Sequence, residues 1–156
     1  MSAVEATLLG HGYYYDELPV GFRMRTVGRT ITESDLTAYI NLTWFTEEVF
    51  VNTHDDGGRV LPVRVVPGSM VYAFAEGMLT PSMQFTGLAF LGAEIDIKGP
   101  TEVGDTIHVE AEVIESRAAA TGNRGLVRTR NAVVNQRGET VLVYTPLRLV
   151  KGTPKP

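Results

Sequence analysis

The segment "PGSMVYAFAEGMLT" (Pro67 to Thr80) decides the fold, because it predicts a helix that is apolar on most of its surface. Pro67 or Ser69 begins this helix, and Pro81 ends it. A helix with apolar side chains on nearly every side has to be buried, and small residues among them allow another element to pack closely. The segment therefore predicts a central helix that needs a sheet around it.

The sheet is predicted in the part of the chain that follows this helix. Four β-rich runs, "LAFLGAEIDIKGP", "TIHVEAEVIESRAA", "GLVRTRNAVVNQRG" and "ETVLVYTPLRLVKG", are separated by turn sequences such as "PTEVGD" and "ATGNRG". In the second run, Ile107, Val109 and Ala111 alternate with polar residues, as in a strand with one buried face. Four long strands at hairpin spacing predict an antiparallel, strongly curved sheet. The predicted fold class is α+β, with this sheet wrapped around the central helix.

A strand and a shorter helix are predicted before the central helix. Residues 21–31 alternate imperfectly between apolar and polar types and predict a strand. Residues 32–43 predict an amphipathic helix, because Thr32 can cap it and Asp35, three residues later, can complete a capping box. Residues 44–66 give no clear pattern and contain a turn sequence, "THDDGGR".

Length and composition limit the classes of protein. A chain of 156 residues predicts one domain over residues 1–156, with flexible ends at 1–12 and 152–156. The net charge of −4 and the absence of basic runs argue against nucleic-acid binding. No cysteine is present, and the three histidines lack metal-ligand spacing, so we expect no metal site. No window reaches the roughly 18 apolar residues of a membrane span, and no signal peptide is evident at the start, so the cytoplasm is the expected location.

Four stretches occur in a fixed order between residues 13 and 151: "YYDELPVGFRMRTVGRTITESDLTAYINLT", "VVPGSMVYAFAEGML", "GAEIDIKGPTEVGDTIHVEAEVIESR" and "VVNQRGETVLVYTPLRLV". As an ordered set they resemble the MaoC-like dehydratases, also called (R)-specific enoyl-CoA hydratases, which have the hotdog fold. The third stretch resembles the family pattern "F-x-x-P-V-x-V-G-D-T-x-x-V" closely. The resemblance implies an acyl-CoA or acyl-carrier thioester as the ligand and no cofactor.

The same resemblance implies a hydro-lyase reaction, the interconversion of 3-hydroxyacyl and 2-enoyl thioesters. The family performs it with the aspartate and histidine of a "D-x-N-P-x-H" motif that follows the first helix. An ungapped alignment from Thr32 puts Phe45 at the aspartate position and Phe50 at the histidine position. Phenylalanine cannot accept or donate a proton, so this chain lacks the usual catalytic pair.

Two other residues of this stretch are candidates for acid–base work. Glu47 would gain a raised pKa if its carboxylate pointed into an apolar cleft beside the neighbouring aromatic rings. His54 could replace the missing histidine, with Asp55 or Asp56 orienting its ring. The alternative for each is an ordinary solvated side chain in a loop.

The resemblance implies that the thioester binds at the start of the central helix. Backbone amides at Gly68 and Ser69 would lack partners within the helix, and they would polarise a carbonyl oxygen placed there. Aromatic side chains near this position are candidates for lining an acyl slot, although such rings are as often plain core. The candidates are Trp44, Phe45, Phe50 and Tyr72. Candidates for contacting the phosphates of CoA are Arg59, Arg64, Lys98 and Arg148.

Three functions remain open on the sequence alone. The first is a MaoC-like hydratase or dehydratase that uses Glu47 or His54. The second is a non-catalytic acyl-CoA-binding protein, or the structural subunit of a hydratase whose partner subunit brings the missing pair. The third is a hotdog thioesterase that uses Glu76 on the central helix. Hotdog domains usually pair through a sheet edge, so we expect a homodimer or a higher assembly of dimers.

Overall fold

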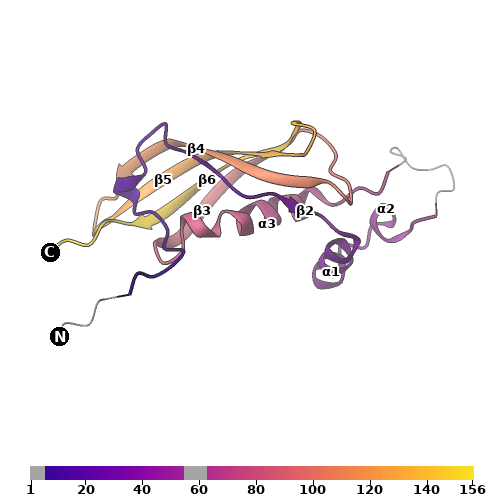
Figure 1. Cartoon of the computed structure of the whole chain (residues 1–156), viewed down its shortest axis with the longest axis horizontal. Helices are drawn as coiled ribbons and strands as arrows, with labels where there is room; N and C mark the ends of the chain where they lie inside the picture. The colour runs from indigo at the N-terminus through magenta and orange to yellow at the C-terminus, as the bar shows by residue number, and fades with distance from the viewer. Residues whose placement is uncertain (1–5, 55–62) are drawn as a thin grey trace.

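The structure, a computed structural model, describes residues 6–54 and 63–156. A curved sheet lies over the helix α3 (Gly68–Met78), and the helices α1 (Glu33–Thr43) and α2 (Glu48–Val51) project beyond one end of the sheet (Figure 1). This arrangement confirms the predicted α+β class, with an antiparallel sheet wrapped around one central helix. None of the described helices is both long enough and apolar enough to cross a membrane.

Four long strands make most of the sheet, as predicted: β3 (Gly87–Ile97), β4 (Thr106–Ala118), β5 (Arg124–Val134) and β6 (Thr140–Lys151). They pair antiparallel, but β3 pairs with β6 and does not form a hairpin with β4. The strand order is β1-β4-β5-β6-β3, so β3 lies at one edge of the sheet.

The strand predicted over residues 21–31 is divided into β1 (Arg23–Arg25) and β2 (Arg29–Thr30), which both pair with β4. The interruption has a local cause at Thr26. Its hydroxyl oxygen accepts the backbone N–H of Val109 at 2.9 Å, so a side chain takes a position that a backbone carbonyl fills in a regular ladder. The prediction of one continuous strand was therefore wrong in this detail.

The helix predictions hold closely. The Thr32 hydroxyl accepts the backbone N–H of Asp35 at 3.1 Å, and the Asp35 carboxylate accepts the backbone N–H of Thr32 at 2.9 Å, which is the expected capping box of α1. Pro67 caps α3. The helix α3 ends at Met78, and Pro81 lies inside a short 3-10 helix that follows it, η2 (Thr80–Ser82). A second 3-10 helix, η1 (Tyr15–Glu17), and the short helix α2 were not predicted.

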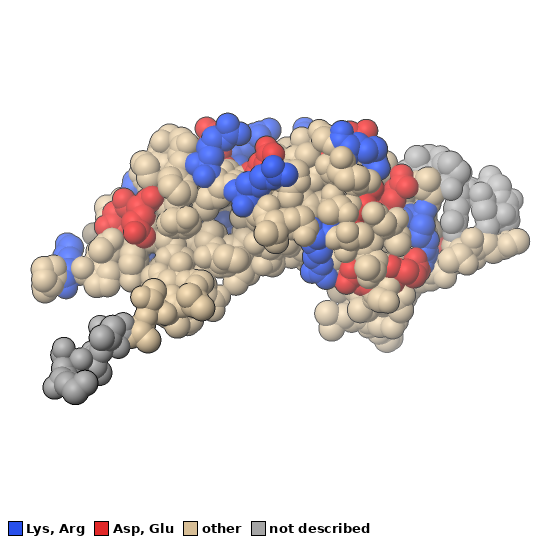
Figure 2. Space-filling view, viewed as in Figure 1, with Lys and Arg blue, Asp and Glu red and all other residues tan. Residues whose placement is uncertain are grey.

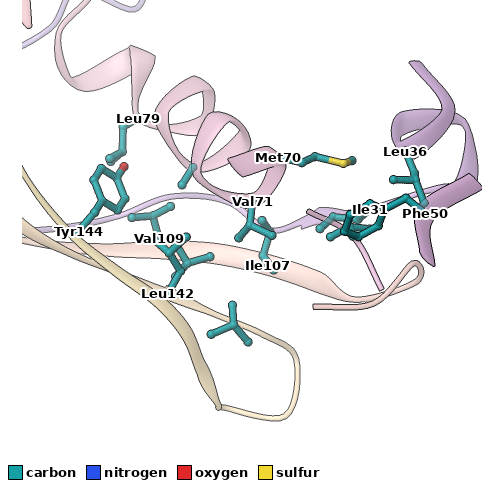
Figure 3. Packing of buried hydrophobic residues seen from close by; sticks show 14 of the residues in the cluster. Ile31, Leu36, Phe50, Met70, Val71, Leu79, Ile107, Val109, Leu142 and Tyr144 are labelled. Carbon is teal, nitrogen blue, oxygen red and sulfur yellow. The ribbon is translucent and has the colours of Figure 1, made fainter. Parts of the chain in front are cut away.

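The core lies between α3 and the sheet. Met70, Val71 and Ala75 of α3 are at most 2% exposed, which confirms that this helix is buried along its inner face. Figure 3 shows the strand residues that meet it from below, including Val109 of β4 and Leu142 of β6, both fully buried. The packing fixes α3 against the sheet and so fixes the position of its N-terminus.

Flexibility of residues 1–12 and 152–156 stays a prediction, and residues 1–5 lie outside the described part of the chain. The innermost residue of each range is held by a backbone hydrogen bond. The backbone N–H of Gly12 donates to the carbonyl of Gln84 at 2.9 Å, and the N–H of Gly152 donates to the carbonyl of Asn123 at 2.9 Å.

Candidate functional site

The N-terminus of α3 presents two backbone donors. The amides of Met70 and Val71 both donate to the carbonyl of Pro67, at 3.0 and 3.3 Å. The amides of Gly68 and Ser69 have no acceptor among the described residues. Because the helix dipole adds a partial positive charge at this end, the two amides favour a carbonyl oxygen or an oxyanion as their partner.

Gly68 lies unusually close to the sheet. A Cβ atom at this position would stand 2.8 Å from the Cδ1 atom of Ile97 on β3. The absence of a side chain at Gly68 therefore leaves room for the Ile97 side chain against the first turn of α3. The approach leaves the helix backbone, and not a side chain, facing the space beside Ile97.

An apolar cavity of about 250 Å³ adjoins this first turn. Its wall combines the start of α3, the end of β3, the turn into β4 and the start of β6. Almost all of its surface is hydrocarbon, which suits an acyl group and not a charged one. The lining residues are Val66, Gly68, Val71, Ile97, Gly99, Pro100, Thr101, Val141 and Leu142.

Three aromatic rings connect α1 and α2 to the same end of α3. The Tyr39 hydroxyl donates to the Ser69 side-chain oxygen at 2.8 Å. The rings of Tyr39 and Phe45 lie 6.5 Å apart between centroids, and those of Phe45 and Phe50 lie 5.5 Å apart. Phe50 is buried, so the two positions that the resemblance equates with the catalytic pair are occupied by packed rings.

Glu47 and His54 both lie outside this aromatic contact. Glu47 precedes α2, and its exposed side chain lines an open pocket with Trp44, Phe45 and Thr46. His54 is exposed, and its backbone N–H donates to the Asn52 side-chain oxygen at 2.9 Å. Asp55 and Asp56, proposed to orient His54, lie outside the described residues.

Trp44 is the most exposed of the candidate aromatic residues, at 85%. It ends α1 in a left-handed conformation with φ of 60°, which is uncommon for a residue other than glycine. Its backbone N–H still donates to the carbonyl of Ile40 at 2.8 Å. The structure thus brings Trp44, Phe45 and Glu47 together at one pocket, while Gly68 lines the apolar cavity.

Further along α3, beyond the apolar cavity beside Gly68, the helix carries the polar residues Tyr72 and Glu76. The ring of Tyr72 meets the buried ring of Tyr144 edge-on, with 5.1 Å between centroids. Burial raises the pKa of Tyr72, and the nearby Glu76 carboxylate raises it further. Glu76 accepts both of its hydrogen bonds from one nitrogen of Arg148, the bond to Oε2 being 2.6 Å long.

The Glu76–Arg148 ion pair was not foreseen from the sequence. The spacing of Gly68, Tyr72 and Glu76 at every fourth residue already put these three on one face of the helix. The partner on β6 could not be identified, because it depends on which strand passes beneath that face. Arg148 was considered as a contact for CoA phosphates, but its side chain is only 11% exposed and bound to Glu76.

Other cations considered for CoA are also paired. Arg64 donates to the Glu33 carboxylate at 2.7 Å and to the backbone carbonyl of Phe50 at 2.6 Å, so it ties α1 and α2 together. Hydrogen bonds from Arg64 lower the pKa of Glu33. Lys98 pairs with Asp96. Figure 2 shows basic and acidic side chains lying close together over the visible face. Arg59 lies outside the described residues.

Two curated proteins are similar to this chain in sequence. Mesaconyl-CoA hydratase of Cereibacter sphaeroides is 27% identical over 144 residues, which cover 90% of this chain and 41% of the relative. An (R)-specific enoyl-CoA hydratase of Rhodospirillum rubrum is 23% identical over 95 residues, which cover 61% of this chain and 65% of the relative. The chain thus spans less than two thirds of the length of either relative. No protein-family model matches it.

Solved structures share the fold. A MaoC-like dehydratase from Rhodospirillum rubrum superposes with a TM-score of 0.78 at 22% identity, covering 92% of this chain and all of the other. A putative MaoC domain protein dehydratase from Chloroflexus aurantiacus superposes with a TM-score of 0.87 at 24% identity, and the match covers 97% of this chain and 45% of the other. A Mycobacterium tuberculosis protein described as having a double hotdog fold superposes with a TM-score of 0.77 at 20% identity, and the match covers 96% of this chain and 48% of the other. The chain therefore has the hotdog fold and is similar in sequence to a mesaconyl-CoA hydratase and an (R)-specific enoyl-CoA hydratase.

Proposed function

We propose that this protein binds acyl-CoA-type thioesters at the N-terminus of α3 and catalyses reversible hydration of a 2-enoyl thioester. One observation carries the proposal: the backbone amides of Gly68 and Ser69 have no acceptor among residues 6–54 and 63–156, and Gly68 lines an apolar cavity of about 250 Å³. A thioester carbonyl at the amides would leave its acyl group beside the cavity. The two curated relatives are named mesaconyl-CoA hydratase and (R)-specific enoyl-CoA hydratase, and both names support a CoA thioester as the substrate class.

The amides would promote hydration by stabilising negative charge on the thioester oxygen. A water oxygen adds to C3 of the enoyl group while a base takes one of the water's protons. The electrons of the double bond move onto the thioester oxygen, where the Gly68 and Ser69 amides hold the developing charge. C2 then takes up a proton, and the carbonyl forms again. The net reaction adds one water molecule to the enoyl thioester and needs no cofactor.

For these reaction steps we propose Glu47 as the base and His54 as the proton donor. Both are exposed on the segment that follows α1 and carries the aromatic rings. The Glu47 carboxylate belongs to the pocket formed with Trp44 and Phe45. Removing either group should lower the rate about a hundredfold or more, the usual contribution of a positioned acid or base.

A non-catalytic acyl-thioester protein is the second candidate. The observation that favours it is the packing of Phe45 and Phe50 against each other, 5.5 Å apart, where the resemblance puts the catalytic aspartate and histidine. In that case a partner subunit would bring the proton-transfer groups, and this chain would supply the thioester site. Thioester hydrolysis by Glu76 has less support, because Arg148 already binds both carboxylate oxygens.

We further propose that the chain forms a homodimer through the edge of β3 that has no partner strand in the part of the chain that the structure describes. That edge is bordered by large apolar side chains that are about half exposed, and edge strands of this kind invite pairing with another strand. These residues are Phe90 at 49%, Leu91 at 53%, Ile95 at 49% and Ile97 at 52%. Binding of an acyl-carrier thioester in place of acyl-CoA, assembly of dimers and a cytoplasmic location stay predictions.

The activity is tested by following the absorbance of the conjugated thioester of crotonyl-CoA, with a thiol reagent in a parallel reaction. Loss of the absorbance without free thiol supports hydration. Release of free thiol shows hydrolysis and contradicts the proposal. If both signals stay constant for crotonyl-CoA and for longer and branched enoyl-CoAs while the protein still binds them, the non-catalytic candidate holds. Glu47→Gln and His54→Ala then identify the source of any activity.

A further inference from the structure

We infer that the site accepts only short acyl chains, because the cavity beside Gly68 is small and does not continue along α3. This inference rests on the proposed function, since it concerns the acyl group of the thioester bound there. It adds the substrate class and the residues that set the limit. Those residues are Tyr72, Tyr144, Glu76 and Arg148.

The first limit is the capacity of the cavity. An apolar cavity of about 150 Å³ in another protein holds one benzene molecule, which has six carbon atoms. At that packing, a cavity of about 250 Å³ takes about ten carbon atoms at most. Part of this space is the open mouth, so the enclosed part of the acyl chain is shorter still. Fatty acyl chains of membrane-lipid length cannot fit.

The second limit lies one helical turn further along α3. Tyr72 and Tyr144 meet edge-on at 5.1 Å, and Tyr144 is only 1% exposed. No residue beyond Val71 on α3 and none beyond Leu142 on β6 lines the cavity. The ring contact therefore stands where a longer chain would have to pass between the helix and β6.

The third limit is electrostatic and lies at Glu76 and Arg148. These residues form an ion pair whose side chains are 24% and 11% exposed. It lies about 12 Å along the helix axis from Gly68, from the rise of an α-helix. An alkyl chain laid over the pair would strip it of its remaining water without offering a hydrogen bond, which is unfavourable. The contact favours chains that end before this point.

The test is a chain-length series of enoyl-CoAs from crotonyl through hexenoyl and decenoyl to dodecenoyl. We expect kcat/KM to fall by about tenfold or more between hexenoyl-CoA and dodecenoyl-CoA, since one misfitting methylene in a pocket costs about tenfold or more. For a non-catalytic protein, the same series is run as dissociation constants of the saturated acyl-CoAs. Equal values for the short and the long chains overturn the inference.

A substitution at Gly99 tests whether this cavity, and not another surface, sets the limit. Gly99 lines the cavity, and a Cβ there meets no atom within 4 Å, so Gly99→Leu adds a side chain without a clash at its first carbon. Gly77→Leu is the matched control, because Gly77 also has an open Cβ position but lies on α3 away from the cavity lining. Gly99→Leu should lower kcat/KM for hexenoyl-CoA by about tenfold more than for crotonyl-CoA.

The outcomes separate the inference from the proposed function. If no acyl-CoA of any length is bound or converted, the proposed function fails. If short and long chains are converted equally, or if Gly77→Leu and Gly99→Leu behave alike, the proposed function stands and the inference on chain length fails. A circular dichroism spectrum of each variant shows that a loss of activity does not come from unfolding.

Discussion

Gly68 has a role both in the packing of α3 and in the proposed thioester site. Its missing side chain lets the first turn of α3 approach Ile97, and its amide is one of the two donors without an acceptor among the described residues. The sequence indicated this position through the Pro-Gly-Ser start of a buried helix. It could not indicate Ile97, because that contact depends on how β3 passes the helix.

Gly68→Ala should destabilise the fold by about 0.5–1.5 kcal/mol, the cost of turning the half-exposed Ile97 side chain away from its preferred rotamer. The new Cβ would stand 2.8 Å from the Cδ1 atom of Ile97, so the end of this half-exposed side chain has to move. Urea unfolding measures the change. Gly77→Ala, in the same helix but with open space around its Cβ, should instead gain up to about 1 kcal/mol. Equal effects of the two changes would show that the close approach is not there.

Asp105 makes the stability of the fold depend on acidity. Its burial raises the pKa, but hydrogen bonds from Gln136, from the backbone of Glu102 and from Arg137 outweigh that effect and hold the pKa below its ordinary value of 3.8. The folded state therefore releases this proton more readily than the unfolded state. The resulting stabilisation is fully present above the unfolded pKa and is lost as the pH falls through the lower, folded pKa.

Asp105→Asn should lower the free energy of unfolding by about 2 kcal/mol near neutral pH, since hydrogen bonds to a charged group are involved. The difference between wild type and variant should shrink below about pH 4, where the unfolded carboxyl takes up its proton. Urea unfolding at neutral pH and at roughly pH 3 measures it. An exposed carboxylate away from the β3 edge, in Glu112→Gln, serves as the control. A difference that does not change with pH would contradict the assignment.

Helix α1 positions Tyr39, which binds Ser69 at the start of α3. The sequence predicted α1 with its cap, because a capping box is a local pattern of residues. It did not predict α2, which has only four residues and depends on tertiary contacts such as the bond from Arg64 to the Phe50 carbonyl. The sequence makes Arg64 a candidate phosphate contact and does not indicate its pairing with Glu33, because a salt bridge between distant segments leaves no local pattern.

Thr32→Ala should destabilise α1, and with it the protein, by about 1 kcal/mol, the usual loss for an N-cap side chain. The removed hydroxyl accepts the Asp35 amide at 3.1 Å. Thr37→Ala is the matched change on the exposed side of the same helix and should be neutral or slightly stabilising. Thermal unfolding compares the two. If Thr37→Ala costs as much as Thr32→Ala, the capping box does not stabilise the helix.

The whole molecule has one long sheet edge without a partner strand among the described residues. Hydrophobic periodicity predicted the four long strands and their antiparallel pairing, because both follow from alternation and turn sequences. It did not predict that β3 crosses over to pair with β6, since pairing order depends on how the strands wrap around α3. That crossover is what puts the half-exposed Ile95 and its neighbours at an edge.

Ile95→Lys should convert a dimer into a monomer, because a charge on an edge strand prevents pairing with a second strand. Light scattering coupled to gel filtration measures the mass at several concentrations. Val27→Lys, which replaces another exposed apolar side chain away from this edge, should leave the mass unchanged. A wild-type protein that stays monomeric at all concentrations would contradict the proposed interface.

The most direct test of the thioester site is the carbonyl stretching frequency of bound butyryl-CoA, labelled with ¹³C at the carbonyl and read by difference infrared spectroscopy. Butyryl-CoA has no double bond to hydrate, so the measurement does not depend on turnover. We expect a shift to lower frequency on binding, retained in Ser69→Ala and reduced in Ser69→Pro, because only proline removes the amide N–H and it is tolerated in the first turn of a helix. A bound carbonyl whose frequency does not shift, or is the same in both variants, would contradict a thioester held by the N-terminus of α3.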